Sequence, residues 1–307
     1  MSTIIERLGV DIGGTNLRVG VVRGLEVVHE LRFPADFSSI CKQHAPATAW
    51  QEILRITLSA LQQVVAEYPR VAGVGIGFPG FISPESGRVV QSPNLPGLRD
   101  VDLAGELSDL LGLPVKVEND ALVAAFGEYM LLAEKPRSMV YLGLGTGVGG
   151  GLIHGGQPYP GDHGMAMEVG HIIVSPHGRK CGCGNLGCLE QYAAATGVIA
   201  SYAEATGEQL LAHEIAARAK AGDSHAQAAY DLAGSTLGIA IAHLAKTLDP
   251  ALVLIGGGMS QAWPLMQKAL KDQLHQDLIP VLRDKTQIVV SGSGDQAGII
   301  GAAYLTA

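Results

Sequence analysis

The sequence predicts an α/β fold, and three observations carry that prediction. Short apolar runs of strand character alternate with longer segments whose apolar residues recur at helical spacing. Glycine-rich turns follow predicted strands near Gly13, Gly145 and Gly256. Hydrophobic residues make up 47% of the 307-residue chain, which is enough for a sizeable core. At this length we expect two domains or one large α/β unit.

The N-terminal part predicts a three-stranded meander over residues 8–11, 17–22 and 26–31, with turns at Gly13-Gly14 and Gly24. Helices and strands should then alternate over residues 48–67 (helix), 71–76 (strand), 101–111 (helix), 115–117 (strand) and 121–133 (helix).

The C-terminal part continues in the same manner. Strands are expected over residues 138–143 and 148–153, and a largely helical stretch runs from about residue 196 to residue 248. Asp249-Pro250 ends that stretch, because the residue before a proline disfavours helical backbone. Strands at 251–255 and 287–290, a helix between them, and a final helix from Asp295 complete the pattern.

Charge and composition exclude several classes of protein. The formal net charge is -8 and no long run of Lys or Arg occurs, so nucleic-acid binding is not expected. No apolar stretch is long enough to span a bilayer, so no membrane association is expected. Glu6 and Arg7 come at once after the start, without the apolar core of a signal peptide, so we expect a cytoplasmic protein.

The first glycine turn is a candidate phosphate loop. Glycines let backbone N–H groups approach an anion, Thr15 adds a hydroxyl, and Asp11 could hold a hydrated Mg²⁺ that bridges phosphates. A tight hairpin turn explains the same residues equally well. The turn consists of Asp11, Ile12, Gly13, Gly14, Thr15 and Asn16.

Two further glycine turns follow strands, at residues 144–151 and 255–259. The first lacks the lysine of a Walker A loop and runs into a strand, unlike a dinucleotide fingerprint. The second presents a flat backbone against which a base or ribose could pack. Each turn alone could be structural, but three such turns favour a nucleotide site.

Asp120 is the candidate catalytic base. It follows Asn119 at the start of a predicted helix, where either residue could simply cap the helix. Phosphoryl transfer to an alcohol uses a carboxylate to accept the hydroxyl proton. Beside the predicted phosphate turns, that role is the better interpretation of Asp120.

The cysteines predict a structural zinc site. His171, Cys181, Cys183 and Cys188 have the spacing His-x9-Cys-x-Cys-x4-Cys, with glycines between the thiols. Three thiolates and one imidazole complete a tetrahedral Zn²⁺ shell and leave no open position for water. The remaining cysteine, Cys41, is expected to be an isolated thiol.

Two glutamates flank this cluster. Glu168 precedes His171 by three residues, and Glu190 follows Cys188 by two. If one nitrogen of His171 binds zinc, the other can donate a hydrogen bond. Glu168, His171 and Glu190 could then present polar groups to sugar hydroxyls from one rigid loop, although solvated carboxylates are the usual fate of Glu.

Together these residues resemble the ROK family of sugar kinases, which has the actin-like, hexokinase-type ATPase fold. The resemblance covers nearly the whole chain, and within the family it is greatest to bacterial glucokinases. The motifs lie at residues 11–15 (DIGGT), 92–94 (SPN), 118–120 (END), 144–147 (LGTG), 168–171 (EVGH), 181–190 (CGCGNLGCLE) and 256–258 (GGG).

The resemblance implies two α/β domains around a central cleft, one of residues 1–118 with 295–307 and one of residues 119–294 that carries the zinc knuckle. It implies that Asp120 takes the proton from the 6-hydroxyl of a hexose and that a homodimer or homotetramer forms. The sugar-binding residues it implies are Gly80, Asn94, Asn119, Asp120, Glu168, His171 and Glu190. The residues it implies for ATP with Mg²⁺ are Asp11, Gly13, Gly14, Thr15, Asn16, Thr146, Gly147, Gly257 and Gly258.

The expected activity is therefore that of an ATP:hexose 6-phosphotransferase, with glucose as the first candidate. Fructose, mannose, N-acetylmannosamine, N-acetylglucosamine and allose are alternatives. Leu122, Met167 and Gln191 depart from the common family pattern and leave that choice open. A non-catalytic sugar-responsive repressor is a remote alternative, because the first motif begins at Asp11, which is too early for a preceding helix-turn-helix.

Overall fold

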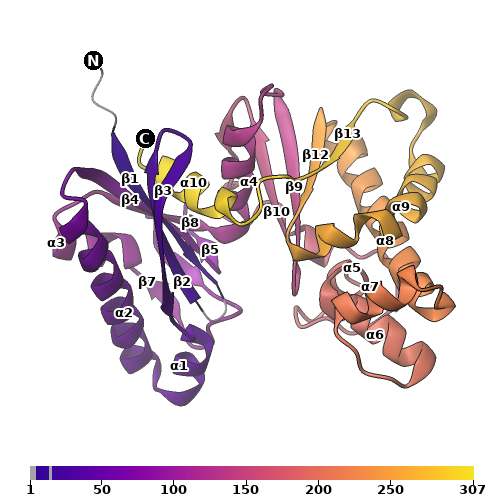
Figure 1. The fold of residues 1–307 in the computed structure, drawn as a ribbon, viewed down its shortest axis with the longest axis horizontal. Helices are drawn as coiled ribbons and strands as arrows, with labels where there is room; N and C mark the ends of the chain where they lie inside the picture. Colours follow the sequence, from indigo (N-terminus) through magenta and orange to yellow (C-terminus); the bar gives the residue numbers. More distant parts are fainter. Residues whose placement is uncertain (1–4, 14–15) are drawn as a thin grey trace. The chain divides into compact units, whose positions relative to one another are not determined.

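The computed structural model describes residues 5–13 and 16–307, which form two compact units (Figure 1). The first consists of Met1–Lys135, Gly151–Ala166 and Ser293–Ala307, and the second of Pro136–Gly150 and Met167–Gly292. Each unit contains segments that are distant in the sequence. Within the part of the chain that is described, no helix combines the length and hydropathy needed to span a membrane.

The first unit is built on a five-stranded sheet of order β3-β2-β1-β4-β8. Its strands are β1 (Glu6–Ile12), β2 (Asn16–Arg23), β3 (Glu26–Pro34), β4 (Val71–Phe78) and β8 (Val115–Asn119). The first three strands pair antiparallel, and β4 and β8 add in parallel. The predicted meander is confirmed.

Helices cover the two faces of this sheet. The apolar side chains of β1 and β4, such as Leu8 and Ile76, pack in one core with Ile53 and Leu61 of α2 (Pro46–Glu67). The C-terminal helix α10 (Gln296–Tyr304) packs on β1 and β4 and on α4 (Asp120–Leu131). The remaining elements of this unit are α1 (Phe37–Gln43), α3 (Leu103–Leu111), the small sheet of β5 (Phe81–Ile82), β6 (Val89–Gln91) and β7 (Arg99–Val101), and β11 (Gln157–Pro158).

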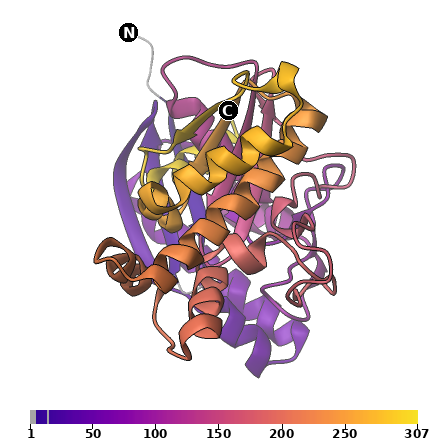
Figure 2. The ribbon, with the colours of Figure 1, turned by 90° about the vertical axis from the view of Figure 1, so that its right-hand side faces the viewer.

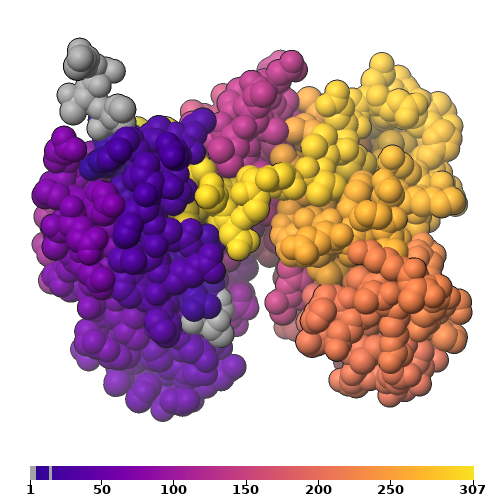
Figure 3. Space-filling view, in the orientation of Figure 1, coloured from indigo at the N-terminus to yellow at the C-terminus, as the bar shows by residue number. Residues whose placement is uncertain are grey.

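Glycines make the contact between α10 and the sheet unusually close. A Cβ atom at Gly9 would lie 1.8 Å from the carbonyl oxygen of Ile299, and one at Gly75 would lie 1.7 Å from that of Ala302. The backbone of α10 therefore rests directly on the strands. In Figure 3, yellow C-terminal residues lie beside indigo N-terminal residues of the same unit.

The second unit contains β9 (Ser138–Leu144), β12 (Leu252–Gly256) and β13 (Gln287–Val290), with β12 parallel to both neighbours. The full strand order is β11-β10-β9-β12-β13, and β10 (Val148–His154) passes from the second unit into the first at Gly151. The helices are α5 (Glu190–Ala193), α6 (Ala195–Thr206), α7 (Ala212–Lys220), α8 (Ser224–Leu248) and α9 (Trp263–Asp277), with short 3-10 turns at Val169–His171, Gly258–Ala262 and Pro280–Leu282. Figure 2 shows α8 and α9 lying along each other, where Gly234 and Gly238 of α8 approach the backbone of α9.

The differences from the predicted elements have local causes. The expected helix over 101–111 begins at Leu103, because Arg99–Val101 forms β7 and the side chain of Asp102 caps the helix. The helical stretch from 196 to 248 is three helices, interrupted at Gly207 and at Gly222, both with positive φ. The short helix α1 and the sheet of β5 to β7 were not predicted.

Candidate active site

The turn between β1 and β2 carries the first candidate phosphate-binding residues. Gly14 and Thr15 lie outside the described residues. Around them, the N–H of Gly13 donates to the carbonyl oxygen of Asn16 at 2.9 Å, which closes the turn. This hydrogen bond is the one expected of a tight hairpin turn, and the role of the turn as a phosphate loop stays a prediction.

Asp11 lies at the end of β1, beside a guanidinium group. Burial raises the pKa of Asp11, and the charge of Arg18, 3.4 Å from Oδ2, opposes the rise. Arg18 also donates to both carboxylate oxygens of Glu30 and to the carbonyl oxygen of Asp295. A cation bound at Asp11 would favour its ionised form further.

The junction between β8 and α4 positions Asp120. The helix begins at Asp120, and its N-cap is Asn119, whose Oδ1 accepts the N–H of Leu122 at 3.1 Å. The side-chain nitrogen Nδ2 of Asn119 donates to the carbonyl oxygen of Gly80 at 3.0 Å. The capping role that the sequence left open between the two residues therefore belongs to Asn119, and Oδ1 of Asp120 accepts the N–H of Ala121 at 2.8 Å.

The neighbours of this junction are partly buried. Gly80 is buried, and a Cβ atom there would lie 2.9 Å from the carbonyl oxygen of Gln91. The buried hydroxyl of Ser92 donates to the carbonyl oxygen of Pro79 and fixes the turn before Gly80. Burial raises the pKa of Glu118, although its Oε1 accepts the N–H of Asn119 at 2.7 Å. The structure thus brings Gly80 and Asn119 together, and Asn94 lies in an exposed turn after Ser92.

The second glycine turn, residues 145–147, joins β9 to β10. Three hydrogen bonds from outside hold this turn and Val148, which follows it directly. Oε2 of Glu190 accepts the N–H of Val148 at 3.1 Å. The N–H of Ala195 donates to the carbonyl oxygen of Gly145, and the hydroxyl of Thr196 to that of Thr146, both at 3.0 Å. The start of α5 and the start of α6 therefore fix the backbone of this turn.

Gly147 allows this arrangement because it has no side chain. A Cβ atom at Gly147 would lie 2.3 Å from Oε2 of Glu190. The third turn is also tightly packed. Gly257 has a φ of +78°, and a Cβ atom there would lie 2.3 Å from the carbonyl oxygen of Leu144, whereas Gly258 has open space on that side. Gly257 therefore has a packing reason for being glycine, and Gly258 is the more open of the two.

The cysteine loop, residues 171–188, gathers the four predicted zinc ligands. Nδ1 of His171 lies 3.6 Å from Sγ of Cys181, and Sγ of Cys183 lies 3.6 Å from Sγ of Cys188. All four ligand atoms lie within 4.8 Å of one another. A tetrahedral zinc ion with bonds of about 2.3 Å to sulfur places its sulfur ligands about 3.8 Å apart, so the cluster has the right size.

The thiols of the cluster influence one another's titration. Burial and the neighbouring thiols raise the pKa of Cys188 to about 12. Hydrogen bonding from the backbone of Asn185 lowers the pKa of the exposed Cys183. Several thiolates at this spacing repel one another unless a metal ion balances their charge.

Glu168 and His171 lie on the other side of this cluster. Nε2 of His171 points away from the thiols and lies 3.8 Å from Oε2 of Glu168. Burial raises the pKa of Glu168, the charge of His171 opposes the rise, and the nearby Glu190 adds to it. The three residues predicted to present polar groups from one loop are therefore neighbours in the second unit.

Sequence reasoning did not find Arg179 or Thr196. Thr196 belongs to the predicted helical stretch, and nothing in its spacing points to the turn fifty residues earlier. Arg179 lies two residues before Cys181 in a glycine-rich loop, where a charged residue is by default expected to be solvated. Both are recognised only from contacts that the fold creates.

Comparison with known proteins identifies the family. Residues 7–307 match the model of the ROK family. A glucokinase of Halalkalibacterium halodurans is 34% identical over 97% of this chain and 94% of its own length. An N-acetylmannosamine kinase of Escherichia coli is 33% identical over 97% of both chains. The crystal structure of a ROK family glucokinase from Streptomyces griseus, in complex with glucose and AMPPNP, superimposes with a TM-score of 0.77 at 31% identity and 98% coverage of both chains. The chain belongs to the ROK family.

Proposed function

We propose that this protein transfers the γ-phosphoryl group of ATP to the 6-hydroxyl of a hexose, with glucose as the preferred sugar. Family membership over residues 7–307 and relatives named glucokinase support a sugar kinase. The structural observation that most directly supports the proposal is at the start of α4. Asn119 caps the helix, and Asp120 occupies its first position without serving as the cap.

Asp120 is the proposed base. A carboxylate in the first turn of a helix is stabilised in its ionised form by the helix dipole, so it can accept a proton at neutral pH. In phosphoryl transfer to an alcohol, that proton comes from the attacking hydroxyl as the bond to phosphorus forms. The contribution of such a base is on the order of 10²- to 10⁴-fold in rate.

Two sets of polar groups are proposed to bind sugar hydroxyls. From the first unit these are the backbone of Gly80 and the amides of Asn94 and Asn119. After its bonds to Leu122 and Gly80, the Asn119 amide keeps one N–H and one oxygen lone pair for a ligand. From the second unit they are Glu168, His171 and Glu190, which neighbour one another at the two ends of the cysteine loop.

The phosphates of ATP are proposed to bind the glycine turns, with Mg²⁺ held through Asp11. The residues are Gly13, Gly14, Thr15 and Asn16 in one turn, Thr146 and Gly147 in the other, and Gly257 and Gly258 for adenosine. The tether of Glu190 to the 145–147 turn supports a preformed anion site, because a fixed backbone needs no ordering when phosphate binds.

The cysteine loop is proposed to hold one structural zinc ion. His171, Cys181, Cys183 and Cys188 fit a closed tetrahedral shell in ligand type and spacing. When bound, the ion supplies charge balance and rigidity, and water has no open position at which to react. Its proposed task is to hold the cysteine loop, next to whose ends Glu168, His171 and Glu190 lie.

We further propose a cytoplasmic homodimer or homotetramer, and functional domains of residues 1–118 with 295–307 and of residues 119–294. Domains that close on substrate exclude water, which would otherwise accept the phosphoryl group. Small-angle scattering with and without hexose would test closure, and light scattering would test the oligomeric state.

The test of the main proposal is an ADP-release assay with glucose, fructose, mannose, N-acetylmannosamine, N-acetylglucosamine and allose. We expect the highest kcat/KM with glucose. A higher value with an N-acetylated sugar would replace glucose by that sugar, an alternative favoured by the N-acetylmannosamine kinase relative. The absence of turnover with every hexose would reject the kinase proposal.

A further inference from the structure

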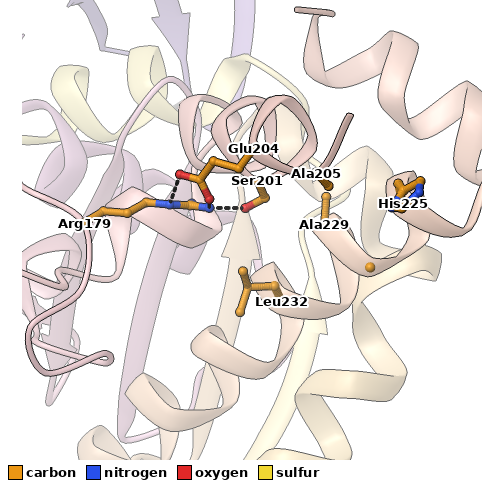
Figure 4. Close-up of a pocket in the computed structure, with 8 residues that line it drawn as sticks. Arg179, Ser201, Glu204, Ala205, His225, Ala229 and Leu232 are labelled. Carbon is orange, nitrogen blue, oxygen red and sulfur yellow. Dashed lines mark hydrogen bonds and ion pairs between the residues drawn. The ribbon is translucent and has the colours of Figure 1, made fainter. Parts of the chain in front are cut away.

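We propose that Arg179 is a positioning residue for the Glu190 carboxylate and the 145–147 turn. This inference rests on the proposed function, because it concerns the groups proposed to bind sugar and phosphate. Arg179 lies in the cysteine loop, two residues before Cys181, and its side chain extends toward Ser201 and Glu204 of α6 (Figure 4).

Its guanidinium group bridges the junction between α5 and α6. Nη1 donates to the carbonyl oxygens of Gln191 in α5, at 2.7 Å, and Gly197 in α6, at 3.2 Å. The two helices are separated by Ala194, whose backbone is extended, with φ -75° and ψ 168°. The arginine therefore fastens the two helix ends on either side of that extended residue.

The remaining donors hold the guanidinium itself in place. Nε and Nη2 bind the two carboxylate oxygens of Glu204 at 3.0 and 2.6 Å, and Nη2 also donates to the hydroxyl of Ser201 at 3.0 Å. The group lies 4.8 Å from the centre of the Tyr192 ring, over its face. A bidentate pair fixes orientation in a way that a single charge contact does not.

The backbone of the cysteine loop is anchored at the same point. The N–H of Arg179 donates to the hydroxyl of Tyr192 at 2.9 Å. A Cβ atom at Gly178 would lie 2.1 Å from that hydroxyl oxygen, so glycine is needed for the approach. The main chain and the side chain of Arg179 thus both bind α5, the short helix that begins with Glu190.

An open pocket of about 300 Å³ adjoins Arg179 and raises the alternative of an anion site. An arginine side chain has five N–H donors. Here those donors serve Glu204 twice, Gln191, Gly197 and Ser201 once each, so none remains for an anion. The contacts favour a role in positioning.

What the junction positions is the second glycine turn. Within the segment that Arg179 fastens, Glu190 accepts the N–H of Val148, and Ala195 and Thr196 donate to the carbonyl oxygens of Gly145 and Thr146. Loosening the junction would displace a proposed sugar ligand and the turn together. Arg179 is not among the four proposed metal ligands, so its substitution leaves all four in place.

The test is Arg179→Met in the full chain, which keeps the apolar stem and removes all five donors. We expect the KM for hexose to rise on the order of tenfold, kcat to change by less than about threefold, and zinc to remain at about one per chain. The KM of Arg179→Lys should lie between those of the parent and of Arg179→Met, because an ammonium group cannot reach acceptors on both helices and Glu204 together.

Arg218→Met is the matched control. Arg218 also pairs with a glutamate, Glu208 at 2.8 Å, and lies 5.8 Å from the centre of a tyrosine ring, that of Tyr202, but it binds α7 to α6 and has no bond to α5. It should lower the melting temperature and leave the KM for hexose unchanged. A lower melting temperature with unchanged KM in Arg179→Met would overturn the inference, because that is the signature of a purely structural contact.

Glu190→Gln separates this inference from the proposed function. If Glu190→Gln raises the KM for hexose and Arg179→Met does not, the positioning role is wrong and the ligand role stands. If Glu190→Gln leaves the KM for hexose unchanged, the proposed role of Glu190 is wrong, whatever Arg179→Met does.

Discussion

The backbone N–H of Val148 donates a hydrogen bond to Oε2 of Glu190 at 3.1 Å, across 42 positions of sequence. This bond joins two features that the sequence presents separately, the glycine turn of a predicted phosphate site and the glutamate of a predicted sugar site. Since Glu190 follows the last cysteine of the loop by two residues, the position of the cysteine cluster also affects the position of the turn. In the second unit these features form one structural element.

The first prediction concerns Gly147. In Gly147→Ala the new methyl group would lie 2.3 Å from Oε2 of Glu190, so the carboxylate must leave Val148. We expect kcat/KM to fall at least about tenfold, since the turn and the proposed sugar ligand both shift. Loss of a charge-assisted hydrogen bond should also lower the free energy of unfolding by roughly 1.5–3 kcal/mol, measured by urea denaturation.

Gly145→Ala controls for stability in the same turn. A Cβ atom there has no neighbour within 4 Å, so the free energy of unfolding should stay within about 0.5 kcal/mol of the parent. Equal destabilisation by both alanines would mean that the turn, and not the contact with Glu190, is sensitive to substitution.

The second prediction concerns the metal. A chelator should remove about one zinc per chain, lower the melting temperature on the order of ten degrees and raise the KM for hexose, because Glu190 and the 145–147 turn lose their support. Re-addition of Zn²⁺ should restore both. Protein that contains no zinc and is equally stable would contradict the prediction.

A pair of buried thiols gives the matched comparison. Cys188→Ala removes a proposed ligand that is fully buried, whereas Cys41→Ala alters a thiol in the core of the first unit. Only Cys188→Ala should lower the zinc content, measured by atomic emission spectroscopy. Both can cost stability, so metal content is the readout that separates them.

Local patterns in the sequence were enough to predict most of the fold. The meander of β1 to β3 was predicted because glycines mark its turns, and the parallel strands because each is a continuous apolar run. The helix α1 has seven residues and β5 has two, which is too short for a hydrophobic period to be recognised. Asn119 and Asp120 are both good caps, so only the hydrogen bond to Leu122 decides between them.

The candidate site was predictable where ligands are close in sequence and unpredictable where they are not. The four proposed metal ligands lie within eighteen residues, and their spacing predicted the cluster that the structure assembles. The bonds from Glu190, Ala195 and Thr196 reach Val148, Gly145 and Thr146, which lie 42 to 50 positions earlier in the sequence. Such contacts depend on how the chain packs, which one sequence does not reveal.

The third prediction is a dependence on pH. Burial raises the pKa of Glu118, so the folded protein holds this proton more tightly than the unfolded chain does. Its contribution to the free energy of unfolding therefore falls as pH rises from the unfolded pKa through the raised folded pKa, and the loss is complete above that window. Glu118→Gln cannot ionise, and its amide oxygen can still accept the N–H of Asn119. The variant should be the more stable protein at pH 7, and the difference should vanish near pH 4.

Urea denaturation at both pH values measures this difference. Glu26→Gln, at an exposed position of the same unit, controls for the change in net charge. A stability difference at Glu118 that is the same at pH 4 and pH 7 would exclude titration as its cause.

The fourth prediction separates catalysis from capping at the start of α4. In Asp120→Asn the amide is isosteric but cannot accept the proton, so kcat should fall by about 10²- to 10⁴-fold. The helix keeps its cap, because Asn119 supplies it, and the cost in stability should be no more than about 1 kcal/mol from the lost charge at the helix N-terminus.

Asn119→Ala should show the converse balance. It removes the bonds to Leu122 and Gly80, so the free energy of unfolding should fall by about 1–2 kcal/mol, and the KM for hexose should rise with the loss of a proposed ligand. Because Asp120 remains, single-turnover phosphoryl transfer at saturating hexose should fall far less than in Asp120→Asn. An Asp120→Asn enzyme that keeps more than about a tenth of the parent kcat would remove Asp120 from the role of base, since general-base catalysis contributes at least about a hundredfold.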